Sequence, residues 1–172
     1  MIEALRLLAL LLFPLGVVFA ALRDLTSYTI PNRVSLSLLA LYLPVALIMG
    51  LPLQAIGLSA LIGAVMLGLG IGMFSLRWIG GGDAKVIAAA GLWLGWPAVM
   101  PFALWTALAG GGLSLILMGG RRLGAPVTDR APAWVGRLLT PGGDVPYGLA
   151  ICFGALMAYP ASPIAQAALG VR

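Results

Sequence analysis

The stretch WIGGGDAKVIAAAG, residues 78–91, places Asp83 and Lys85 directly after three glycines and at the head of a long apolar run. Only five of the 172 residues are acidic, while 62% are hydrophobic, 9% are charged and the mean hydropathy is +1.09. Soluble domains do not have this composition, so the chain is predicted to be an integral membrane protein. Because an ionised side chain is costly to place in a bilayer, Asp83 is a candidate functional residue.

Apolar segments recur along the whole chain and predict an all-α membrane protein, a polytopic bundle of about six transmembrane helices. The predicted spans are 7–22, 34–49, 53–76, 84–95, 98–118 and 145–159. The fourth span is short, so it is expected either to extend past Pro97 or to be shielded by neighbouring helices. As one helix, residues 86–118 would measure about 50 Å against a hydrocarbon core of ~30 Å, so a break is expected near Pro97.

Charge gives the expected orientation of these spans. Lys and Arg gather in alternate predicted loops, at Arg23, Arg33, Arg77, Lys85, Arg121, Arg122, Arg130 and Arg137, whereas the two intervening loops have none. Since short cytoplasmic loops are enriched in these residues, both termini are predicted to lie outside, and residues 119–144 to form a cytoplasmic basic loop. The alternative for the first segment is a cleaved signal peptide, but cleavage would place the first basic loop outside, against its charge.

With this topology, Asp24 ends the first span and Asp83 begins the fourth, both at the cytoplasmic border. Residues 24–32 read D-x-x-x-x-x-I-P-N, and residues 80–85 read G-x-G-D-x-K. Glycines at 80 and 82 let another backbone approach and let the chain turn sharply, although they would equally suit a simple helix cap. Pro31 before an apolar run favours the start of a helix.

Together with VPYGLAI at residues 145–151, these two motifs resemble those of the type IV prepilin peptidases, the bacterial G-x-G-D intramembrane aspartyl proteases. The chain looks most like the short peptidases of Flp/Tad-type pilus systems. The resemblance implies one integral-membrane peptidase domain over residues 1–172, located in the bacterial inner membrane. It implies removal of the short basic leader from prepilins or pseudopilins at the cytoplasmic face, for pilus assembly or secretion.

The same resemblance assigns roles to individual residues. It implies that Asp24 and Asp83 are the catalytic dyad. The supporting motif residues are Pro31, Asn32, Gly80, Gly82 and Lys85, and the residues that border the substrate cleft are Pro146, Tyr147 and Gly148. Larger family members carry an insertion with two Cys-x-x-Cys pairs and also methylate the new N-terminus. This chain lacks both the insertion and those cysteines, so methyltransferase activity is not expected.

The residue types agree with aspartyl chemistry. Two neighbouring carboxylates share a proton, so one acts as a base on water and the other as an acid on the scissile carbonyl. The chain has no histidine and one cysteine, Cys152, which excludes Ser/His and Cys/His catalysis, a Cys/His metal cluster and an intrachain disulfide. Neither a metal nor a cofactor is expected, and Cys152 is interpreted as a small buried apolar residue.

Other features have two interpretations. Lys85 either supports the dyad electrostatically or reaches a lipid phosphate, and the second is preferred because residues i and i+2 do not share a helix face. APAWVGRLL, residues 131–139, is either an amphipathic helix on the inner leaflet or a flexible connector. Asp144 is interpreted as a solvated turn residue on the same face as the dyad.

The expected partners are a prepilin or pseudopilin substrate helix and membrane lipid. Nucleic acid is not expected, since no soluble patch interleaves basic and aromatic residues. The sequence does not determine the oligomeric state. Two other functions remain as alternatives: a small proton-coupled transporter, which would need carboxylates near the midplane, and a structural subunit of a secretion machine, in which the aspartates would serve assembly alone.

Overall fold

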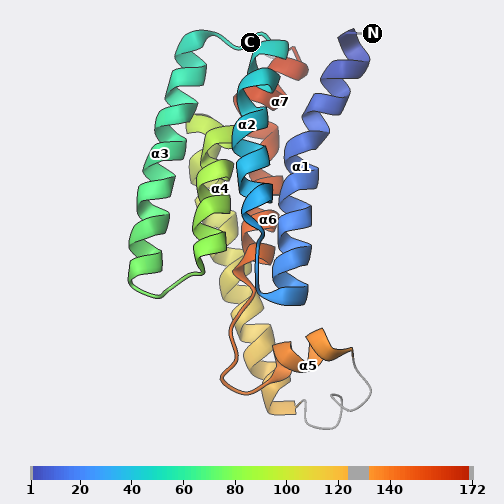
Figure 1. Ribbon diagram of the computed structural model, residues 1–172, viewed down its shortest axis with the longest axis vertical. Helices are drawn as coiled ribbons and strands as arrows, with labels where there is room; N and C mark the ends of the chain where they lie inside the picture. The colour runs from blue at the N-terminus through green and yellow to red at the C-terminus, as the bar shows by residue number, and fades with distance from the viewer. Residues whose placement is uncertain (1, 124–131, 171–172) are drawn as a thin grey trace.

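The computed structural model describes residues 2–123 and 132–170, and this part of the chain is helical without strands (Figure 1). The elements are α1 (Ile2–Ser27), α2 (Asn32–Ile48), α3 (Leu53–Ser75), α4 (Gly81–Leu123), α5 (Ala133–Leu139), α6 (Tyr147–Ala158), the 3₁₀ helix η2 (Tyr159–Ala161) and α7 (Pro163–Ala168). By length and composition, α1, α3 and α4 are each able to cross a membrane, while α2 and the segment Tyr147–Ala161 are shorter apolar helices. The prediction of an all-α membrane protein is confirmed.

Helix α4 is two arms joined by a reversal at Gly95. The backbone of Gly95 is non-helical, with φ 61° and ψ −172°, and Figure 1 shows the chain rising along the first arm and returning along the second. The break predicted near Pro97 is therefore found two residues earlier, and Pro97 lies in the first turn of the second arm, where a proline is favoured. The two arms correspond to the predicted spans 84–95 and 98–118.

Only glycine suits the position of this reversal. A positive φ of this size is strained for residues with a Cβ. A Cβ at Gly95 would also lie 2.8 Å from Ser59 Oγ and 3.2 Å from Pro163 Cγ. The reversal is thus packed against α3 on one side and α7 on the other.

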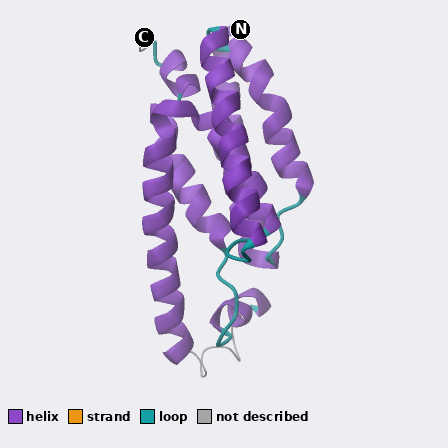
Figure 2. Ribbon diagram, turned by 90° about the vertical axis from the view of Figure 1, so that its left-hand side faces the viewer, coloured by secondary structure: helices purple, strands orange, loops and turns teal. Residues whose placement is uncertain are grey.

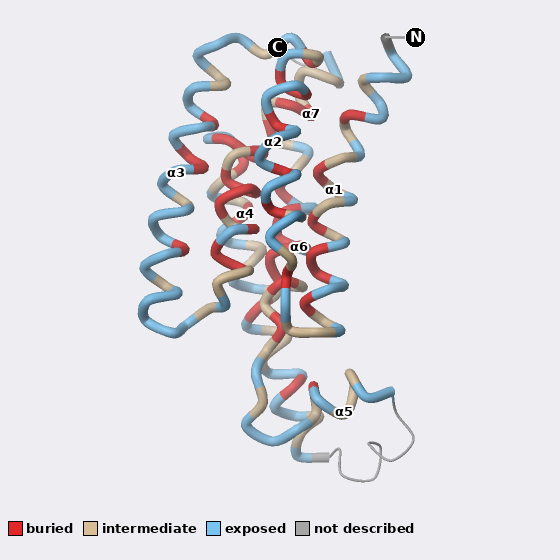
Figure 3. The backbone as a smooth tube through the Cα atoms, in the orientation of Figure 1, coloured by how far each residue is buried: buried red, intermediate tan, exposed pale blue. Residues whose placement is uncertain are grey.

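The first arm of α4 lies in the centre of the bundle, which explains how so short a helix is accommodated. Ala89, Ala90, Trp93 and Leu94 are each 0% exposed, and Figure 3 shows this arm as largely buried among the surrounding helices. Trp93 Nε1 donates to the backbone oxygen of Leu38 at 2.8 Å, which satisfies its buried N–H. Of the two expectations for this span, shielding by other helices is the one found.

The two ends of the bundle differ. Both termini lie at one end, and the α1–α2 and α3–α4 connections lie at the other, as Figures 1 and 2 show. The second arm of α4 extends past this second end, where α5 packs beside it. The aspartates therefore lie at the end opposite to the termini.

The predicted loop 119–144 is more ordered than expected. Residues 119–123 continue α4, and residues 133–139 form α5, so a helix is found where a flexible connector was the alternative. Arg121 explains part of this order, because its Nε donates to the Leu138 oxygen at 3.0 Å and its guanidinium to the Asp144 oxygen at 2.8 Å. Residues 124–131, Arg130 among them, lie outside the described residues.

We predict that Gly95→Ala lowers the free energy of unfolding by about 1–3 kcal/mol, since it forces alanine into a strained conformation. The measurement is thermal unfolding of the purified protein in detergent. Gly68→Ala is the matched control, because a Cβ at that helical glycine of α3 meets nothing within 4 Å. The account of the reversal would be wrong if the two variants unfolded at the same temperature.

Candidate active site

Asp83 lies in the first turn of α4, where its own helix start holds it. Asp83 Oδ2 accepts a hydrogen bond from the Gly80 backbone N–H at 3.3 Å. This is the geometry in which the third residue of a helix reaches back to the N–H preceding the helix. The side chain is only 7% exposed, and Oδ1 has no hydrogen-bond partner among the described residues. One carboxylate oxygen is thus fixed, and the other is left for another group.

Asp24 lies near the end of α1 and is held by a different helix start. Its Oδ2 accepts a hydrogen bond from the Gly148 backbone N–H at 2.8 Å, across 124 residues of sequence. Gly148 is the second residue of α6, and the free N–H groups of a helix start favour a negative charge. A Cβ at Gly148 would lie 2.7 Å from Asp24 Cβ, so a glycine is needed for the carboxylate to come this close.

The two sequence motifs pack directly on each other. A Cβ at Gly82 would lie 3.0 Å from Ile30 Cβ and 3.4 Å from Ile30 N, so this glycine lets the I-P-N segment approach the start of α4. Pro31 is the residue that precedes α2, with extended backbone at φ −61° and ψ 136°. Ile30 itself is buried, so water is excluded from this contact.

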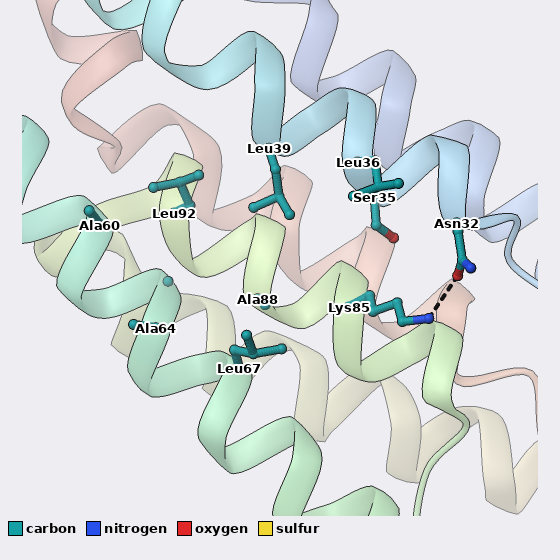
Figure 4. Close-up of a pocket in the computed structure, with 11 residues that line it drawn as sticks. Asn32, Ser35, Leu36, Leu39, Ala60, Ala64, Leu67, Lys85, Ala88 and Leu92 are labelled. Carbon is teal, nitrogen blue, oxygen red and sulfur yellow. Dashed lines mark hydrogen bonds between the residues drawn. The ribbon is translucent and has the colours of Figure 1, made fainter.

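A polar contact also joins the motifs. Lys85 Nζ donates to Asn32 Oδ1 at 2.7 Å, as Figure 4 shows, and both side chains are exposed. This contact tests neither of the two interpretations of Lys85, which were electrostatic support of the dyad and binding of a lipid phosphate. It does show that Lys85 is turned toward the start of α2 and connects the two motif segments.

Asp24 and Asp83 line the same cavity at the end of the bundle. Its volume is about 780 Å³, within the range of ligand-binding clefts. The other lining residues come from the α1–α2 connection, from the end of α3 and the α3–α4 connection, and from the segment that leads into the first residue of α6: Tyr28, Phe74, Ser75, Arg77, Trp78, Ile79, Gly80, Gly143, Asp144, Val145 and Tyr147. The structure therefore brings together two carboxylates that are far apart in the sequence.

The remaining predicted site residues lie around this cavity in different ways. Tyr147 lines it, Pro146 is buried next to it at the start of α6, and Gly148 lies behind Asp24 as its hydrogen-bond donor. Asp144 is exposed and lines the cavity wall, and its backbone oxygen accepts the bond from Arg121. Cys152 is buried, which confirms its interpretation as a small apolar residue.

Tyr28 is a lining residue that sequence reasoning missed. It follows α1 with a left-handed backbone, φ 51°, and its hydroxyl donates to the Asp144 backbone oxygen at 3.4 Å. Burial raises the pKa of the Tyr28 phenol above its ordinary value, so the hydroxyl, which is protonated at neutral pH in any case, stays a donor to higher pH. It falls within D-x-x-x-x-x-I-P-N at a position the motif leaves unspecified, and so the sequence contained no signal for it.

Residues 11–115 match the model of the type IV leader peptidase family. The chain belongs to this family. The match includes Asp24, Asp83 and both motifs, and it ends before α6. Neither the curated proteins nor the solved structures give a significant match. Membership implies a membrane-bound leader peptidase. Asp24 and Asp83 are the acidic residues within the matched range.

We predict that Gly148→Ala displaces Asp24 from the start of α6 and destabilises the peptidase by about 1–3 kcal/mol, as overpacking of a close contact does. Leader peptidase activity should fall with it, because the carboxylate loses its place in the cavity. Thermal unfolding and cleavage of a leader-bearing substrate in membranes measure the two effects. Gly136→Ala in α5, where a Cβ meets nothing within 4 Å, should leave stability and activity unchanged. Equal behaviour of the two variants would contradict the role of Gly148 in positioning Asp24.

Proposed function

We propose that the chain is an intramembrane aspartyl endopeptidase that removes the short basic leader of a prepilin or pseudopilin at the cytoplasmic membrane face. The pilus or secretion system that it serves would be of the Flp/Tad type. The observation that carries the proposal is the common cavity of Asp24 and Asp83, which belongs to a chain of the leader peptidase family. The location of the dyad at a bundle end, rather than in the middle of the helices, favours a peptidase over a proton-coupled transporter.

The proposed chemistry uses the two carboxylates as a pair. At close range they do not both ionise readily, so they share a proton and titrate together. The ionised member takes a proton from a water that attacks the scissile carbonyl, while the protonated member donates to the carbonyl oxygen. The Gly148 and Gly80 N–H groups orient one oxygen of each carboxylate and leave the other oxygen for water and substrate.

The cavity also has features that suit an extended peptide. It lies at the end of the bundle, and Gly80, among its lining residues, has no side chain beside the Asp83 carboxylate. A substrate helix lying beside the bundle in the bilayer would bring its leader junction to this depth. Cleavage would leave an unmethylated N-terminus, because the cysteine-containing insertion of the bifunctional members is absent from the sequence.

Charge supports the cytoplasmic side for this end. Basic residues gather at the aspartate end of the bundle, on Arg77, Arg121, Arg122 and Arg137, whereas the termini lie at the other end. Under the positive-inside rule, the dyad faces the cytoplasm and both termini lie outside. The membrane would be the bacterial inner membrane, where such leaders are accessible from the cytoplasm.

We predict that Asp24→Asn and Asp83→Asn each reduce leader removal at least ~100-fold, since each change removes a group that transfers a proton in the reaction. The assay is co-expression with Flp-type prepilins, followed by mass determination of the pilin at equal membrane abundance of each variant. Glu3→Gln is the matched control, because Glu3 is a carboxylate at the opposite end of the bundle, 84% exposed. Processing that survives either aspartate change would remove the dyad from the mechanism and favour the assembly role.

We also predict that chelators such as EDTA and 1,10-phenanthroline leave the rate of processing within about twofold of the untreated rate, since the dyad activates water without a metal. In residues 2–123 and 132–170, no three histidine, cysteine or carboxylate side chains cluster as metal ligands. The measurement is processing in purified membranes before and after chelation. Loss of activity on chelation that returns with added metal would contradict the aspartyl mechanism.

A further inference from the structure

A second cavity lies on the flank of the bundle, between α2, α3 and the first arm of α4 (Figure 4). Its volume is about 440 Å³, and it shares no lining residue with the cavity of the aspartates. Most of its wall is apolar, from Leu36, Leu39, Ala60, Gly63, Ala64, Leu67, Ala88 and Leu92. Its polar residues, Asn32, Ser35 and Lys85, lie toward one end, where α2 and α4 begin. This set of residues is called the flank groove below.

The polar end of the flank groove has unused hydrogen-bonding capacity. Lys85 Nζ carries three N–H donors and gives one to Asn32, so two remain for another acceptor. Ser35 is a lining residue that is only 2% exposed, and its Oγ, which is itself buried, has no hydrogen-bond partner among the described residues. A buried hydroxyl without a partner is unfavourable, and this one therefore points to an acceptor or donor that the isolated chain does not supply.

The order of these groups along the helices matches an amphiphile. From Lys85 to Leu92 the groove runs about 10 Å along α4, at 1.5 Å per residue, and becomes wholly apolar. Ser35 lies one turn of α2 beyond Asn32, or about 4.5 Å deeper along the helix. A phosphate at Lys85 would meet a cation, and an ester oxygen at Ser35 would meet a hydroxyl donor. A hydrocarbon chain toward Leu92 would meet apolar side chains. No acidic residue is among the described residues that line the groove, so an anion is not repelled there.

The floor of the flank groove is too closely packed for a helix to enter it. A Cβ at Gly63 would lie 3.0 Å from Leu92 Cβ and 3.4 Å from the Ala88 backbone oxygen, so α3 and α4 are in direct contact beneath it. A transmembrane helix with its side chains is about 10–12 Å across and would span the groove without filling it. A single hydrocarbon chain fits the crease between the two helices.

We propose that the flank groove binds one anionic phospholipid, with its phosphate on Lys85 and Asn32, an ester oxygen on Ser35 and one acyl chain against α3 and α4. Asn32 and Lys85 belong to the two motif segments that hold Asp24 and Asp83. The bound lipid therefore stabilises the contact between these segments, and on the proposed function it makes the peptidase sensitive to the headgroup composition of the membrane.

The test measures lipid binding and needs no substrate, so it is independent of the proposed peptidase mechanism. The full chain is purified, delipidated and reconstituted with phosphatidylglycerol or phosphatidylcholine, and retained lipid is counted by native mass spectrometry. Lys85→Met removes the cation, and Ala64→Leu narrows the groove with the cation in place. Arg33→Met is the matched control, because Arg33 is exposed, adjoins Asn32 in sequence and lines a different cavity, with Gly16 and Leu41.

We expect the wild-type chain to retain one phosphatidylglycerol in preference to phosphatidylcholine. Lys85→Met and Ala64→Leu should each weaken its retention at least ~10-fold, while Arg33→Met should retain it as the wild type does. Equal loss in Arg33→Met would show diffuse charge attraction instead of a site and would overturn the proposal. Equal retention of the two lipids would overturn it as well. A prepilin transmembrane peptide that displaces the lipid, with the same dependence on Ala64, would assign the groove to a substrate helix and also overturn it.

Discussion

The burial of two carboxylates at one end of an apolar bundle is the constraint on which the rest of the structure depends. Asp24 and Asp83 are only 6% and 7% exposed, and a buried charged group is costly unless it is hydrogen-bonded, so each needs compensation from the protein. The structure supplies it from helix starts, where backbone N–H groups are free: Gly148 in α6 for Asp24, and Gly80 before α4 for Asp83. Because a Cβ at Gly148 or Gly82 would press on Asp24 or Ile30, glycine is required where these segments meet.

The reversal at Gly95 makes this arrangement possible. It places the first arm of α4 in the centre of the bundle, with Trp93 stacked on Phe13 of α1 at a ring distance of 5.4 Å. It also returns the second arm to the aspartate end, so that α6 can begin where α1 ends. The contact between Asp24 and Gly148 therefore depends on a turn far from either residue. A family match that ends at residue 115 includes this turn and excludes the α6 start that completes the cavity.

Much of the fold follows from the sequence, because lipid leaves few choices for an apolar backbone. The helical segments, the break in α4 and the position of both aspartates at one bundle end were predictable from hydropathy, glycine and proline. The bond from Gly148 to Asp24 was not, since no local pattern relates residues 124 apart. The same holds for the contact of Lys85 with Asn32 and for Tyr28, whose left-handed backbone breaks the preference of its residue type. The catalytic roles remain predictions drawn from the family resemblance and the shared cavity.

The most direct test of the central claim, that Asp24 and Asp83 face one cavity, is chemical cross-linking in membranes. Cys152 is changed to serine, Asp24 and Asp83 are changed to cysteine together, and a short bifunctional thiol reagent is added before intact-mass measurement. The account predicts one bridging reagent per chain and no remaining thiol, whereas a Glu3→Cys and Asp83→Cys pair, at opposite ends of the bundle, should take up two separate reagents. Two separate reagents on the aspartate pair would contradict the account.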